Sequence, residues 1–155
     1  MTGKLCVLAA ALALAAPPAQ ARDLPSGGLT RAEVAQWLQD HGYKAKTHLD
    51  TAGNTIVSSA SDGVNWDIYF YSCSKAERCA SLQYAAGWSG LVLEDGTINT
   101  WNAGNRYIRA YVTGKDAVWG EYDIDISPGG TWEQLDQSLD RWGAALPDFK
   151  KAIGE

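Results

Sequence analysis

Few side chains in this sequence have the types and spacing that catalysis requires. A serine stands between glycines at 87–90 (GWSG), but this segment lacks the G-x-S-x-G spacing of a serine nucleophile. Only two histidines, His41 and His48, are present, and neither has the spacing of a metal ligand. A Ser-His-Asp site is therefore disfavoured, and the sequence contains no phosphate-binding glycine loop or zinc pattern.

Two carboxylates in the last third of the chain have a pattern that could support chemistry. Asp123 and Asp125 fall on one face of an expected strand, beside Glu121. Paired carboxylates can exchange protons with a substrate or bind Ca²⁺. Because these residues alternate with Tyr122 and Ile124, a solvated outer face is the favoured interpretation. We expect no catalytic residue, no cofactor and no metal site.

A polar and aromatic cluster at 97–102 (TINTWN) is the most distinctive segment. Asn99 and Asn102 share one side of a short expected helix, and Ile98 and Trp101 share another. One interpretation is a ligand-binding cluster of Asn99, Trp101 and Asn102. The favoured interpretation is a structural joint between two groups of strands, because an unpaired buried amide or carbonyl costs about 1–3 kcal/mol.

The first 21 residues resemble a secretory signal peptide. Lys4 precedes an apolar run over residues 5–16, two prolines break the run, and residues 19–21 (AQA) form a cleavage site. The run is too short to span a bilayer. We expect cleavage after Ala21 and a periplasmic or secreted mature protein, with no transmembrane segment after cleavage.

Two cysteines remain beyond the expected cleavage site, Cys73 and Cys79. In an oxidising compartment such a pair usually forms a disulfide, which we expect to be structural. A redox pair or a metal site is the alternative, but five residues separate the cysteines, unlike the C-x-x-C of redox domains.

Composition restricts the choice of partners. The formal net charge is −5 and no cluster of Lys and Arg occurs, which argues against nucleic acid and anionic membranes. All seven tryptophans lie beyond the expected cleavage site. Most are expected in the core, and the alternative is an exposed aromatic platform that binds sugars or peptides.

Hydrophobic periodicity predicts a single α+β domain over residues 30–155, after a flexible leader over residues 22–29. Capping boxes at 30–33 (TRAE) and 131–134 (TWEQ) start the first and last helices. Pro147 is expected to kink or split the last helix. The strands should form an antiparallel sheet of about six strands, covered by the two helices. The expected order is helix 30–41, strands 43–49, 55–60, 64–71 and 82–88, helix 94–104, strands 106–113 and 117–126, and helix 131–153.

The order and spacing of several segments resemble the bacterial YbjN-domain family. These are the hairpin 62–66 (DGVNW), an aromatic strand that runs into Cys73, then Cys79 and Gln83, the cluster 98–102 (INTWN) and the strand 106–110 (RYIRA). The family is labelled as sensory transduction regulators, and exported members with two cysteines are a familiar subtype. The resemblance implies a fold similar to that of type III secretion chaperones, with helices packed on a curved antiparallel sheet. It implies no catalytic residues.

Two classes of function follow. The leading hypothesis is an exported, non-catalytic, chaperone-like binding protein that uses the sheet or its aromatic residues to hold a peptide or partner protein. The alternative is a module that binds carbohydrate or an envelope polymer, or less favourably a small hydrolase. That alternative would use exposed tryptophans among Trp88, Trp101 and Trp119, and the Asp123/Asp125 edge. A homodimer is compatible with the sequence.

Overall fold

The computed structural model describes residues 21–155, so the predicted signal peptide, except Ala21, lies outside the described residues. The predicted order of helices and strands, α-β-β-β-β-α-β-β-α, is confirmed. Along the chain the elements are α1 (Arg31–Asp40), β1 (Lys46–Leu49), β2 (Thr55–Ser61), β3 (Val64–Cys73), β4 (Cys79–Ser89), α2 (Thr97–Gly104), β5 (Arg109–Thr113), β6 (Ala117–Asp125) and α3 (Trp132–Ala152).

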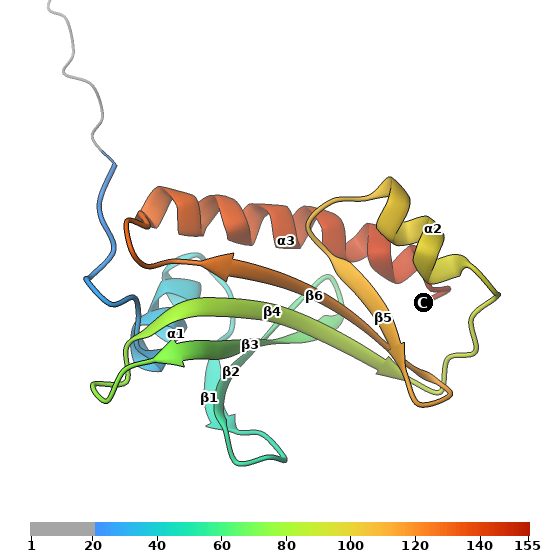
Figure 1. Cartoon of the computed structure of the whole chain (residues 1–155), viewed down its shortest axis with the longest axis horizontal. Helices are drawn as coiled ribbons and strands as arrows, with labels where there is room; N and C mark the ends of the chain where they lie inside the picture. The colour runs from blue at the N-terminus through green and yellow to red at the C-terminus, as the bar shows by residue number, and fades with distance from the viewer. Residues whose placement is uncertain (1–20) are drawn as a thin grey trace, which may run out of the picture.

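The strands form an open antiparallel sheet in the order β1-β2-β3-β4-β6-β5. β1 to β4 are neighbours in sequence, and the chain then leaves the sheet through α2. It returns as β5 at the far edge, and β6 fills the place between β5 and β4 (Figure 1). β5 pairs with β6 only from Ala117 to Glu121, so the last residues of β6 extend beyond it.

The three described helices pack on one face of the sheet, which we call the inner face. In Figure 1, α3 runs along this face and α2 lies near the C-terminal end of α3. α1 is joined to α3 by a hydrogen bond from Trp37 Nε1 to Asp136 Oδ1 (2.8 Å). Strand alternation explains the choice of face, because inner residues of β3 such as Trp66 and Ile68 are buried while Asn65 is exposed.

Aromatic side chains fill the space between α3 and the sheet. Trp142 of α3 is fully buried, and its ring stacks on Tyr84 of β4 with 5.6 Å between centroids. The edge of Trp66 meets the same indole at 6.1 Å. About two helical turns further on, Phe149 presses against Gly120 of β6, where a β-carbon would overlap its ring. The inner face of β6 therefore needs glycine at this position.

Both predicted capping boxes are present. Thr30 Oγ1 accepts from the N–H of Glu33, and Glu33 Oε2 accepts from the N–H of Thr30 (2.8 Å). Thr131 and Gln134 make the same exchange at the start of α3. Glu33 also accepts from both terminal nitrogens of Arg78 (2.9 and 3.0 Å), which joins α1 to the loop between β3 and β4. The start of α1 is thus fixed to its own backbone and to the sheet.

Two local expectations differ from the structure. Of the two alternatives at Pro147, a kink or a split, the split is wrong: α3 is one helix through the proline, with its apolar stripe buried on both sides at Trp142 and Phe149. The segment 22–29, expected as a flexible leader, packs on the domain. Leu24 and Leu29 are buried in it, and its main chain bonds to residues 79, 130 and 132. Apolar burial and main-chain pairing outweigh its Pro and Gly content.

Within residues 21–155, the helices are too short or too polar to cross a membrane.

Replacing Trp142 with alanine tests how much of the fold depends on α3. We expect Trp142→Ala to lower the free energy of unfolding by about 3–5 kcal/mol, because a fully buried indole leaves a large cavity. Trp142→Phe is the control and should cost less, because it keeps the aromatic packing and removes an Nε1–H that has no hydrogen-bond partner in the described residues. Urea unfolding measures both, and an unchanged midpoint for Trp142→Ala would contradict the role of α3.

Candidate functional site

Cys73 and Cys79 form the predicted disulfide. They are directly opposite each other at the ends of β3 and β4, so the bond closes the loop of residues 74–78. Cys79 is fully buried, and its main chain bonds to Leu29 in both directions (2.9 and 3.2 Å). The bridge therefore fixes the end of the hairpin on which the segment before α1 rests.

Trp101 and Asn102 of the candidate cluster attach α2 to β5. Trp101 is buried, its Nε1 donates to the carbonyl of Ile108 (2.9 Å), and its ring packs on Phe149. The Asn102 Nδ2 donates to the carbonyl of Ala110 (2.9 Å), and Oδ1 accepts from the N–H of Ala110 (2.9 Å). The side-chain amide thus pairs with β5 as the main chain of a neighbouring strand would.

Asn99 is separated from these two contacts. It is exposed and lies at a hollow of about 250 Å³ between α2 and the loop 91–95. The three residues predicted as one cluster therefore do not converge on a common point. A structural joint at Trp101 and Asn102 stays a prediction, with the geometry above as its basis.

The tryptophans considered for an exposed platform have different surroundings. Trp101 is buried, and Trp88 is half-buried on the inner face with its ring against Phe149. Trp119 is half-buried on the opposite face, the face of the sheet that none of the described helices covers. Of the three, Trp119 is the one placed to contact a large partner.

We call this uncovered side of the sheet the open face, and it carries both aromatic and acidic side chains. Residues opposite each other in the register share a face, so Asp67, Ala85, Glu121 and Arg109 form one row across four strands. The open face is defined by Ser58, Asp67, Tyr69, Tyr71, Gln83, Gly87, Arg109, Tyr111, Trp119, Glu121, Asp123 and Asp125.

Trp119 lies flat on the open face because its neighbour on β4 is a glycine. A β-carbon at Gly87 would lie 2.9 Å from three atoms of the six-membered ring of Trp119. Because the three distances are equal, the face of the ring, and not its edge, lies over Gly87. The indole therefore rests on the main chain of β4, and its other face is turned away from the sheet. Such a flat ring provides a surface for stacking on an apolar, aromatic or sugar face.

Glu121 is the centre of the polar contacts on the open face. Its side chain is 11% exposed and accepts from Tyr111 Oη (2.5 Å) and from Arg109 Nη2. The Arg109 side chain is far more exposed, so the ion pair opens to solvent on one side. A buried carboxylate held by two donors is fixed in orientation before any partner arrives.

Burial and nearby carboxylates raise the pKa values of the tyrosines around Glu121. Burial, and then the carboxylate of Glu121 that accepts a hydrogen bond from its hydroxyl group, raise the pKa of Tyr111 to about 12. The pKa of Tyr71 is raised by burial and by Glu121 and Asp123. That of Tyr69 is raised by burial and by Asp67. These phenols stay protonated in neutral solution and serve as hydrogen-bond donors.

A second chain of hydrogen bonds runs beside Glu121. Tyr71 Oη donates to Gln83 Oε1 (3.2 Å), and Gln83 Nε2 donates to Asp123 Oδ1 (2.8 Å). Asp123 and Asp125 therefore belong to the open face, where the sequence placed them, but Asp123 is tied to an amide. The described residues contain no group of three or more His, Cys, Asp or Glu side chains that could hold a metal ion.

The open face could be found only in part from the sequence. Alternation in residues 117–126 indicates which side chains share a face. Tyr71 of β3 comes near Glu121 only because β4 and β6 pair across the break at α2, whereas Tyr111 meets Glu121 within the β5–β6 hairpin. The geometry suits binding of a partner over a broad surface by aromatic stacking and by carboxylates.

An open antiparallel sheet, with the described helices on one face and an aromatic and acidic face left uncovered by them, defines a small α+β domain. A model of the YbjN family, described as "Putative bacterial sensory transduction regulator", matches residues 30–155, and the chain belongs to this family. No curated protein matches the chain.

Substitution of Asn102 tests the structural joint. Asn102→Ala removes two hydrogen bonds to Ala110 and should destabilise the protein by about 1–3 kcal/mol. Asn99→Ala is the matched control and should change stability by less than about 0.5 kcal/mol, because Asn99 is exposed. Thermal unfolding measures both variants. Equal melting temperatures for the two would contradict the joint.

The link between Tyr111 and Glu121 has a spectroscopic test. In Glu121→Gln the neutral amide no longer disfavours ionisation of the phenol, so the pKa of Tyr111 should fall from about 12 toward its ordinary value of 10.0. Ultraviolet titration of tyrosinate measures this, with Tyr111→Phe to identify the contribution of this residue. A titration curve that does not change in Glu121→Gln would show that the contact is absent in solution.

Proposed function

We propose that this chain is an exported, non-catalytic binding protein that holds a basic segment of a partner protein on its open face, in the manner of a chaperone. The proposal includes a signal peptide cleaved after Ala21 and a single YbjN domain over residues 30–155. The observation that carries it is the aromatic and acidic open face around Glu121, which the described helices leave uncovered.

The charges of the open face favour a basic partner. Four carboxylates lie on it, from Asp67, Glu121, Asp123 and Asp125, against one guanidinium from Arg109. An excess of one sign on a binding surface attracts the opposite sign and steers its approach. Aromatic rings beside carboxylates add favourable contact with Lys and Arg side chains.

The disulfide supports the exported location. A bond between Cys73 and Cys79 persists in an oxidising compartment and is rare in the cytosol. A partner-binding role is compatible with the family description of a sensory transduction regulator.

Binding of a carbohydrate or an envelope polymer is the second candidate. The observation that favours it is the flat ring of Trp119 on Gly87, with the carboxylate of Glu121 at the next open-face position of β6. Planar polar groups beside an aromatic ring can bond hydroxyl groups while the ring covers the sugar.

One pair of glycine variants tests the open face. Gly87→Ala places a methyl group against Trp119 and should displace the ring, whereas the added methyl group in Gly104→Ala meets no other atom. The probes are two labelled peptides of equal length and apolar content, one rich in lysine and one rich in glutamate. Gly87→Ala should weaken binding of the lysine peptide about five-fold, and Gly104→Ala should leave it unchanged.

The same titration with glucan and peptidoglycan fragments decides between the two candidates. The carbohydrate alternative would be established if the protein binds a fragment but not the lysine peptide, and if Gly87→Ala abolishes binding of that fragment. Equal affinity for the lysine and glutamate peptides would contradict the charge argument.

A further inference from the structure

The edges of the sheet differ in how they are protected. β1 at one edge is only four residues long, is exposed throughout and carries Lys46, which discourages pairing with another strand. β5 at the other edge is covered at Ala110 by the side-chain amide of Asn102. Both edges thus have features that block the addition of a strand.

The end of β6 lacks this protection. β5 pairs with β6 only as far as Glu121, and within residues 21–155 no strand pairs with 122–125 on that side. The N–H of Ile126 donates to the carbonyl of Ala80 in the β4 direction (2.8 Å). Main-chain groups alternate in direction along a strand, so those of Asp123 and Asp125 point away from β4. These amides and carbonyls are available to a partner strand.

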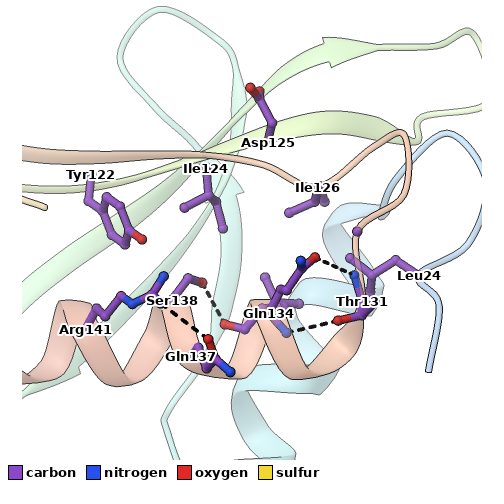
Figure 2. Close-up of a pocket in the computed structure, with 12 residues that line it drawn as sticks. Leu24, Tyr122, Ile124, Asp125, Ile126, Thr131, Gln134, Gln137, Ser138 and Arg141 are labelled. Atoms are coloured by element: carbon purple, nitrogen blue, oxygen red, sulfur yellow. Dashed lines mark hydrogen bonds between the residues drawn. The ribbon is translucent and has the colours of Figure 1, made fainter. Parts of the chain in front are cut away.

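A cleft of about 340 Å³ lies between this end of β6 and α3. Figure 2 shows Tyr122 and Ile124 of β6, and Ile126 just after it, pointing toward α3, while Asp125 points the opposite way. Gln137 and Arg141 line the helical side (Figure 2). A free strand edge and a cleft for side chains are the two parts of a site for strand addition.

We propose that the edge at 122–125 and the cleft beside it bind an extended peptide segment as an added strand. The segment alternates basic and uncharged, partly apolar residues. This inference rests on the proposed function for its class of partner, a basic polypeptide, but it uses a surface separate from Trp119.

The alternation follows from the two sides of β6. Side chains of an added strand that lie beside Asp123 and Asp125 face two carboxylates, so Lys or Arg is favoured there. The intervening side chains enter the cleft, where the guanidinium of Arg141 repels a cation. Ile124 and Ile126 provide apolar contact for those residues.

A second copy of this chain is a poorer occupant. When β6 is set antiparallel to itself with the same faces aligned, the outer residues that meet are Glu121, Asp123 and Asp125 from both copies. Every such register over 121–125 places carboxylates opposite carboxylates, which destabilises the pairing. The charges therefore favour a foreign strand over a homodimer through this edge.

The test uses a labelled peptide in which lysine alternates with valine, and a control in which glutamate replaces lysine. Hydrogen exchange of the whole mature chain should show that the lysine peptide protects the amides of Asp123 and Asp125. Asp125→Pro removes one of these donors without touching the β4 side, and should abolish this protection. Gly104→Ala, whose added methyl group meets no other atom, is the control and should leave the protection unchanged.

If Asp125→Pro fails to fold, reversing the charge of the same residue still tests the proposed strand addition. Asp125→Lys should weaken the lysine peptide about five-fold and strengthen the glutamate peptide. Binding of the lysine peptide without protection of Asp123 and Asp125 would overturn strand addition and leave the proposed function standing. Protection of these amides by self-association, without peptide, would also overturn it.

Discussion

Burial of the apolar stripe of α3 against the inner face of the sheet is the contact on which the rest of the structure depends. Trp142 fits between Tyr84 and Trp66, and Phe149 is pressed onto β6 at Gly120. Because side chains alternate along each strand, committing one face to the helices determines which residues are left on the other. α1 and α2 then pack beside α3 on the same side, so the opposite face stays uncovered within the described residues.

The side chains of the uncovered face are held in place although none of the helices within residues 21–155 packs on it. Hydrogen bonds hold its charged groups, with Glu121 between Tyr111 and Arg109, and Gln83 between Tyr71 and Asp123. A surface arranged in this way loses little conformational freedom when a partner binds, which favours affinity for a given area of contact. A binding role therefore agrees with how the fold distributes its side chains, and membership of the YbjN family agrees with the same architecture.

The order of helices and strands could be predicted because each element has a strong local signal, such as the capping boxes at Thr30 and Thr131 and the alternation in β3. The disulfide followed from the cysteine count and spacing. The contact of Gln83 with Asp123 could not be predicted, because it requires β4 to pair with a strand that follows a helix and another strand. The expectation of a flexible leader over residues 22–29 was wrong for a related reason. Leu24 is buried by residues distant in the sequence, which local composition does not reveal.

The two glycines that admit aromatic rings occupy neighbouring strands and open toward opposite sides. Gly87 of β4 faces Trp119, and Gly120 of β6 faces Phe149, one register position away. At this point the main chains of β4 and β6 lie between an indole on the open face and a phenyl ring of α3. Close-packed interiors transmit displacement rather than absorb it. A displacement of the Trp119 ring on the open face is therefore expected to pass through the main chain of the sheet to Phe149, in the C-terminal half of α3.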